Sequence, residues 1–202
     1  IPKEGFAEYG EFPWTVAIFY TDDTNRINYV CGGALIHPEV VLTAAHCLKN
    51  IKSDLKIRAG EYDSRNENEK YPHQDREVAS ATIHSRYDAK HLLNDIALLF
   101  LKKKVDLAAH INVVCLPPAD TVLEMGRCIS NGWGRESFGK EGVMTKVDLP
   151  MVSRVQCQSD LRRKNLWMYF MVHQSFVCAG GEPGKDTCKG DGGSPLVCPF
   201  KN

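Results

Sequence analysis

The chain lacks several features that would place it in a common class of protein. It has no run of about 18 apolar residues, so no membrane-spanning helix is expected. It has no excess of one charge, because 25 Lys and Arg residues balance 25 Asp and Glu residues, and nucleic acid or a membrane surface is therefore not an expected partner. It also has no C-x-x-C pair, no glycosylation sequon and no internal repeat, and the cysteine spacing excludes the common zinc patterns.

Cysteine is present in an even number and is spread along the whole chain. The eight residues are Cys31, Cys47, Cys115, Cys128, Cys157, Cys178, Cys188 and Cys198. Such a set favours disulfides and an oxidising compartment, whereas the alternative is a cytosolic protein with buried free thiols. We expect a secreted, extracellular protein. No signal peptide opens the chain, and we expect it to be part of a longer precursor.

Helical periodicity is scarce, and short apolar runs recur between turn residues. The runs at 15–20, 33–36, 40–43 and 96–100 predict strands, and the polar stretches at 21–28, 63–77 and 135–142 predict surface loops. One polar, basic stretch at 159–165 predicts a short helix. The 202 residues suffice for one large β domain or two small ones, and no linker divides them, so the pattern predicts an all-β sandwich or barrel.

Three segments carry chemistry. His46 follows a predicted strand, Asp95 begins another, and a glycine-rich loop occupies 190–195. A histidine can take a proton from a nucleophile, a carboxylate can fix the tautomer of that histidine, and backbone N–H groups of glycines can hold a developing oxyanion. The order histidine, aspartate, nucleophile loop is one of three known for this type of site.

These segments, with Pro13-Trp14, Cys31-Gly32-Gly33, 131–134 and 178–180, resemble the trypsin-like serine proteases from residue 1 to the end of the chain. The resemblance implies a chymotrypsin-like fold of two packed six-stranded antiparallel β-barrels. It also implies that residues 1–202 are one serine-protease-like domain, truncated relative to the family, whose short C-terminal part is not in this chain.

The loop differs from the family pattern where the chemistry is most demanding. Gly192 stands where the resemblance implies the attacking serine, and Ser194 stands where it implies a glycine. His46 and Asp95 match the base and its orienting acid, and Gly190 and Gly192 match the oxyanion hole. Losing the serine of such a triad costs about a million-fold in turnover, so we expect no proteolysis and a remnant His46–Asp95 hydrogen bond that is buried.

The main alternative is a relocated nucleophile. Ser194 lies two residues further along a tight turn and could in principle replace the missing hydroxyl. An error of 1 Å in its position would cost about 100-fold in rate.

The resemblance implies roles for two more aspartates. Asp186 matches the floor of a specificity pocket for Arg or Lys, and the alternative is an ordinary loop carboxylate. Asp191 matches the partner of a freed N-terminus at Ile1, but Pro2 departs from the usual opening, so the standard insertion is not expected.

The resemblance also implies the disulfides Cys31–Cys47, Cys128–Cys198 and Cys157–Cys178. Cys115 and Cys188 would then pair with segments outside this chain, Cys115 with an upstream clip domain. An acidic loop with Glu61, Asp63, Asn66 and Glu69 looks like the calcium loop of some relatives, and the alternative is a solvated acidic loop. No other cofactor is expected.

The sequence Gly-Asp-Gly-Gly-Ser-Pro and the segments 61–63 and 71–76 look most like the clip-domain serine protease homologues of arthropods. This implies a binding cofactor in prophenoloxidase activation, the melanisation pathway of innate immunity, located in haemolymph. The implied partners are prophenoloxidase or its activating protease, and self-association would fit the group. The alternatives are a weak trypsin-like protease that uses Ser194, and a pseudo-protease with another adhesion or binding role.

Overall fold

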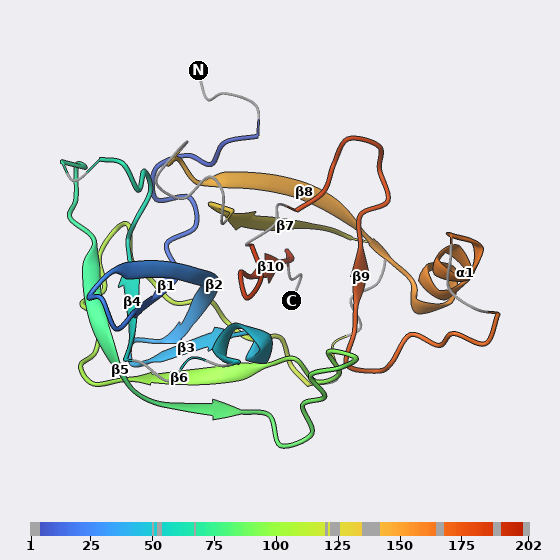
Figure 1. Cartoon of the computed structure of the whole chain (residues 1–202). Coiled ribbons are helices and arrows are strands. Elements are labelled where there is room, and N and C mark those ends of the chain that lie inside the picture. Colours follow the sequence, from blue (N-terminus) through green and yellow to red (C-terminus); the bar gives the residue numbers. More distant parts are fainter. Residues whose placement is uncertain are drawn as a thin grey trace.

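The computed structural model describes residues 5–49, 51, 54–66, 68–119, 121, 126–134, 142–164, 168–187 and 191–199. Its first half is a closed antiparallel barrel in the strand order β1-β2-β3-β6-β5-β4 (Figure 1). The strands are β1 (Thr15–Thr21), β2 (Ile27–His37), β3 (Val40–Thr43), β4 (Leu55–Ala59), β5 (Gln74–Ile83) and β6 (Ala97–Leu101). The four strands predicted from apolar runs are β1, β2, β3 and β6, and they are confirmed. The predicted loops at 21–28 and 63–77 are partly wrong, because β2 begins within the first at Ile27 and β5 within the second at Gln74. The predicted loop at 135–142 lies outside the described residues except for Gly142.

The barrel is filled by branched aliphatic side chains that alternate along its strands. Val16, Ile18, Leu35, Val41, Ile57 and Leu99 are all 0% exposed and pack in one cluster. Each strand has a neighbour on both sides, so closure leaves no open sheet edge. The short helix η1 (Ala45–Leu48) follows β3 directly and lies against this core.

The second half is a smaller sheet in the order β10-β7-β8-β9. These strands are β7 (Arg127–Gly132), β8 (Thr145–Val152), β9 (Cys178–Ala179) and β10 (Leu196–Val197). Within the part of the chain that the structure describes, this half has four strands, where a second six-stranded barrel was expected. Both edge strands are only two residues long, so the hydrogen-bond ladder ends before it can close. The all-β, chymotrypsin-like fold itself is confirmed.

The two halves share a second apolar cluster. Phe12, Phe19, Trp133 and Met144 are buried together at the junction. Asn131 in β7 donates to Thr15 Oγ1 at 2.8 Å, which joins a strand of each half. This junction fixes where the loop after residue 190 meets the barrel.

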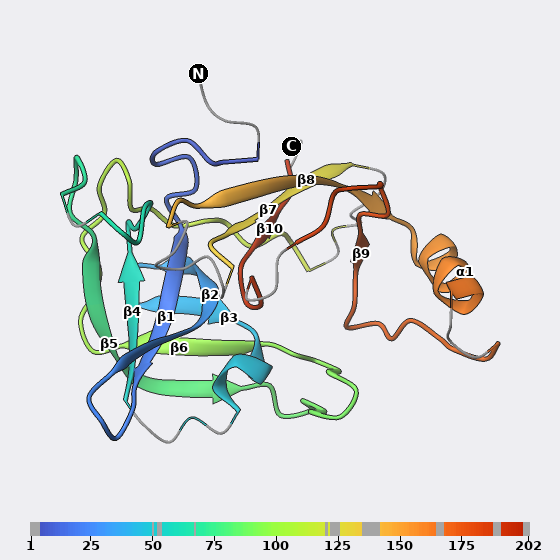
Figure 2. The same ribbon diagram turned by 45° about the horizontal axis from the view of Figure 1, so that its top comes forward.

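The helix α1 (Arg154–Lys164) extends away from both sheets in the two views of the ribbon (Figures 1 and 2). It starts earlier than predicted because Ser153 accepts a hydrogen bond from the backbone N–H of Gln156 and so caps the first turn. Among the described residues, no helix has the length and apolar character needed to cross a membrane.

Candidate functional site

The His46–Asp95 pair is assembled where two adjacent barrel strands end. β3 and β6 are paired, with Thr43 opposite Ala97, so the residues just beyond β3 and just before β6 meet. One oxygen of Asp95 accepts from the backbone N–H of His46 at 2.7 Å, and the other lies 2.6 Å from His46 Nδ1. When Asp95 is ionised its carboxylate can only accept, which places the proton of this bond on Nδ1, and in the neutral imidazole Nε2 then keeps its lone pair.

The imidazole of His46 is more exposed than a remnant hydrogen bond was expected to be. Its side chain is 41% exposed, whereas that of Asp95 is 17% exposed. The expectation of a fully buried pair is therefore wrong for the histidine. The residue that faces the ring is Gly192, which has no side chain to cover it.

Gly192 faces the basic nitrogen directly. A Cβ atom on Gly192 would lie 2.9 Å from His46 Nε2 and 3.2 Å from His46 Cε1. Residue 192 is thus the position in this loop whose side chain would meet the base. Its φ lies outside the left-handed region, so the backbone there would accept a side chain once the exposed ring moved by a few tenths of an ångström.

The loop that carries Gly192 is fixed against β2. The N–H of Gly32 donates to the carbonyl of Gly192 at 3.0 Å, and the N–H of Ser194 donates to the carbonyl of Asp191 at 2.9 Å. Gly193 has φ +79°, and a Cβ on it would lie 2.4 Å from Thr43 Oγ1 and 2.5 Å from the carbonyl of Gly32. A glycine at 193 therefore sets the path of the loop past the barrel.

Ser194 does not point at the histidine. Its Oγ lies where a side chain on Gly32 would be, 1.9 Å from the Cβ position of that residue, and 3.1 Å from the Cβ position of Gly132. The hydroxyl is buried and has no hydrogen-bond partner among the described residues. Ser194 thus occupies the space left by two glycines at the junction of the two halves.

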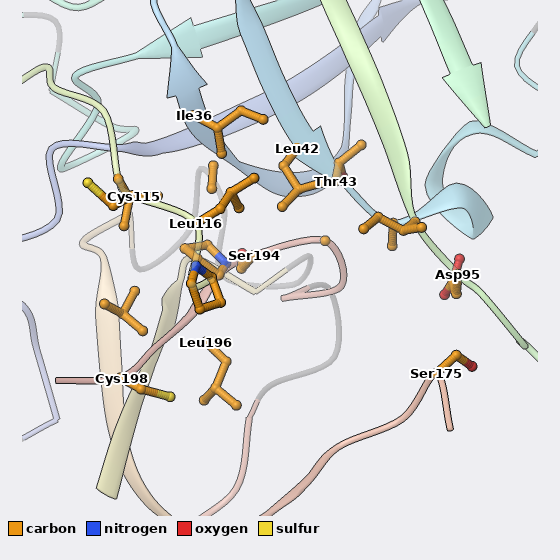
Figure 3. A pocket seen from close by; sticks show the side chains of 18 of the residues that line it. Ile36, Leu42, Thr43, Asp95, Cys115, Leu116, Ser175, Ser194, Leu196 and Cys198 are labelled. Atoms are coloured by element: carbon orange, nitrogen blue, oxygen red, sulfur yellow. The ribbon is translucent and has the colours of Figure 1, made fainter. Parts of the chain in front are cut away.

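Ser194 lines an apolar cavity of about 810 Å³ beside the pair. Its apolar lining includes Ile36, Leu42, Leu116 and Leu196. Figure 3 shows Ser194 among these apolar side chains and Asp95 apart from it at the edge of the cavity. Cys115 lines the same cavity and is an exposed free thiol in the described structure.

The remaining loop residues are placed in part. Asp191 accepts from the N–H of Gly134 at 2.9 Å. Burial raises the pKa of Tyr29, and the negative charge of Asp191 raises it further. Asp186 is exposed and accepts from the N–H of Thr187 at 2.8 Å. It is not among the residues that line the cavity beside the pair, and its role in a specificity pocket stays a prediction. Ile1, Cys188 and Gly190 lie outside the described residues.

The structure contains the three disulfides that the resemblance implies. Cys31–Cys47 joins β2 to η1 beside the histidine, with Cys47 Sγ 3.7 Å from His46 Nε2. Cys128–Cys198 joins β7 to the segment after β10, and Cys157–Cys178 joins α1 to β9.

Glu61, the first predicted calcium ligand of the acidic loop, bonds to other groups of the protein. Glu61 is 5% exposed, and its Oε2 lies 3.2 Å from Arg58 Nη1 and 3.5 Å from His73 Nδ1. Its other oxygen accepts from the N–H of Tyr62 at 3.1 Å. These bonds hold the carboxylate of Glu61 in place.

The other predicted calcium ligands make similar local bonds. Asp63 pairs with Arg65 at 3.0 Å, and Glu69 accepts from the N–H of Asp63 at 2.7 Å. Asn66 Oδ1 accepts from the N–H of Asn68 at 3.0 Å. Burial raises the pKa of Glu69, and the charges of Glu61 and Asp63 raise it further. In the described residues, the acids of this loop do not form a group of three with ligand atoms within 4.8 Å of one another, and calcium binding stays a prediction.

The family profile of the trypsin domain matches residues 3–201. The chain belongs to the trypsin family. It is 50% identical over 212 residues to phenoloxidase-activating factor 2 of Galleria mellonella, covering 98% of this chain and 70% of that protein. It is 43% identical over 198 residues to inactive CLIP domain-containing serine protease A28 of Anopheles gambiae, covering 97% of this chain and 52% of that protein.

A solved structure agrees with these relatives on the fold. Human heparin binding protein superposes with a TM-score of 0.76 at 28% identity, covering 96% of this chain and 79% of that one. The chain spans between 52% and 70% of the length of the three curated relatives with which it shares 42–50% identity. Together they identify it as a serine protease homologue of the clip-domain group.

Two glycines that the sequence motifs contain have structural roles that were not predicted from the sequence. Gly32 leaves room for the hydroxyl of Ser194, and Gly134 holds Asp191 through its N–H. For Gly32 the signal was present in the Cys31-Gly32-Gly33 motif, because a glycine inside a strand often marks a place that another group approaches closely.

Proposed function

We propose that this chain is catalytically inactive and acts as a binding cofactor in prophenoloxidase activation. The observation that carries the proposal is the pairing of an intact His46–Asp95 hydrogen bond with a residue at 192 that has no hydroxyl. A base without a nucleophile beside it cannot start acyl transfer. The names of the relatives, a phenoloxidase-activating factor and inactive CLIP-domain proteases, support the same class and pathway.

The proposal extends to the setting of the whole protein. Its partners would be prophenoloxidase or the protease that activates it, in haemolymph. The exposed thiol of Cys115 is suited to a covalent link with an upstream clip domain, and three disulfides fit an extracellular location. Self-association and calcium binding belong to the same proposal.

The second candidate is a weak protease that uses Ser194, and the geometry does not favour it. A nucleophile must lie within hydrogen-bond reach of its base, about 2.6–3.2 Å. The hydroxyl of Ser194 is enclosed between Gly32 and Gly132 and makes no hydrogen bond among the described residues, to His46 or to any other group.

A serine-directed fluorophosphonate tests the chemistry. We expect no adduct on the folded, full-length protein by intact mass spectrometry. The matched variant is Gly192→Ser, which places a hydroxymethyl group next to His46 Nε2, and we expect it to be labelled. An adduct on Ser194 of the unsubstituted protein would contradict the proposal and support the weak protease.

Reconstitution tests the cofactor role. Purified prophenoloxidase and its activating protease are assayed for phenoloxidase activity with and without the full-length protein. We expect higher activity with it, and the same increase with Ser194→Ala, because a binding cofactor does not need that hydroxyl. No increase, with folded protein, would exclude this role and leave an adhesion or other binding function.

A further inference from the structure

The helix α1 and the segment after it form a compact, pre-organised unit, here called the α1 unit and comprising residues 153–164 and 168–179. The guanidinium group of Arg154 donates to the carbonyls of Val172 and His173 at 2.9 and 2.7 Å, and to that of Phe176 at 3.2 Å. Arg162 donates to the carbonyl of Phe170 at 2.7 Å. With the Cys157–Cys178 disulfide, these bonds hold the segment against the helix.

The outer surface of this unit is apolar to an unusual degree. Val155 is 81% exposed, Met168 is 72% exposed and Tyr169 is 77% exposed. Val155 and Met168 line a shallow depression of about 430 Å³ whose other walls include Arg162 and Arg163. Contiguous exposed apolar side chains with a polar rim are typical of interaction sites, and Met, Tyr and Arg are enriched where proteins meet.

The α1 unit carries a net positive charge. The sequence from 153 to 181 contains Arg154, Arg162, Arg163 and Lys164 but a single acidic residue, Asp160. Asp160 pairs with Arg163, so it cannot neutralise the other three cations. The chain as a whole is balanced, and this local excess therefore favours an acidic partner.

We propose that the α1 unit docks a polypeptide segment that carries acidic side chains beside apolar ones. The apolar side chains would fill the depression between Val155 and Met168. The acidic ones would meet Arg162 and Arg163, whose guanidinium groups each have five N–H donors and use one nitrogen for the carbonyl of Phe170 and for Asp160, respectively. A sulfated polysaccharide would use the cations but would leave Met168 and Tyr169 in water, which is why the polypeptide is the better fit. The surface lies outside the His46–Gly192 site, and the proposal does not depend on a role in phenoloxidase activation.

A display library of random twelve-residue peptides, selected on the immobilised full-length protein, tests the proposal. The enriched peptides are synthesised with a fluorescent label and titrated by fluorescence anisotropy at physiological salt. Two variants probe the surface: Met168→Ser with Tyr169→Ser, and Arg163→Glu. Their matched controls are Ile27→Ser and Lys104→Glu, which change exposed residues of the same kinds on the barrel. Circular dichroism checks that each variant is folded.

We expect the enriched peptides to combine Asp or Glu with aromatic or aliphatic residues. Each α1 variant should weaken their binding about tenfold, and each control less than about twofold. Enriched peptides that bind the α1 variants as well as the original protein would overturn the proposal. A second result would also overturn it. In that result heparin displaces the peptides, and heparin binding is weakened by Arg163→Glu but not by Met168→Ser with Tyr169→Ser.

Discussion

The barrel and the second half of the molecule differ in how firmly they hold their parts of the catalytic arrangement. In the barrel, every strand has two neighbours, and the residues that hold His46 and Asp95 are continuous with a fully buried core. In the second half, the sheet ends in strands of two residues, and the nucleophile loop and the α1 unit extend from it. Packing within the barrel thus maintains the His46–Asp95 geometry. This geometry can therefore remain in a protein that does not use it for catalysis. The helix α1 and residue 192 of the loop can change with little cost to that packing, whereas Gly193 cannot, because its backbone passes close to Thr43 and to the carbonyl of Gly32.

The largest expected difference between the two regions is in the stability lost when a leucine side chain is shortened to alanine. Leu99→Ala removes a fully buried side chain between β3 and β5 and should lower the free energy of unfolding by about 2–5 kcal/mol. Leu161→Ala, on α1 with its side chain 38% exposed, should cost about 0.5 kcal/mol. Urea unfolding of both variants measures this, and equal losses would show that α1 is as much a part of the core as β6.

Gly192 and Gly193 lie where the two halves meet, and an alanine at each should change the stability by different amounts. Gly193→Ala forces a side chain into left-handed backbone and against the carbonyl of Gly32, and it should cost about 1–3 kcal/mol. Gly192→Ala meets only the movable end of His46 and should cost less than about 1 kcal/mol. Thermal unfolding compares them. A larger loss at 192 would mean that the ring of His46 is rigidly held.

The smallest effect concerns charge on the barrel surface. Burial raises the pKa of Asp75, but hydrogen bonds from Arg58 and Lys56 lower it by more, so the pKa lies below its ordinary value of 3.8. The charged carboxylate therefore stabilises the fold above that value, and the stabilisation disappears as the pH falls through the folded-state pKa. Asp75→Asn should cost about 1 kcal/mol at pH 7 and progressively less as the pH falls below 3.8 and through the folded-state pKa.

Unfolding of the Asp75→Asn variant and the original protein at several pH values gives the difference directly. A constant difference across this range would show that shape, and not charge, is what Asp75 contributes. Lys102→Ala, at an exposed pair with Glu77, is the control that should change stability little at pH 7.

The sequence predicted the parts of this structure that depend on local pattern. Apolar runs located β1, β2, β3 and β6, since each is buried on the barrel interior. β5 was missed because most of its residues are exposed or half-buried, and its position is set by pairing with β4 and β6 and not by its own composition. The half-exposed ring of His46 and the buried hydroxyl of Ser194 depend on how the two halves meet, which no single segment encodes.

Two disulfides, Cys157–Cys178 and Cys128–Cys198, have a common consequence for proteolysis. Arg162, Arg163 and Lys164 are sites for a protease that cuts after basic residues, and they lie inside the loops that both disulfides close. A nick after any of them would leave both fragments covalently joined, with one new amino terminus and one new carboxylate in place of a peptide bond. The nicked molecule would run as one species until reduced and as two afterwards.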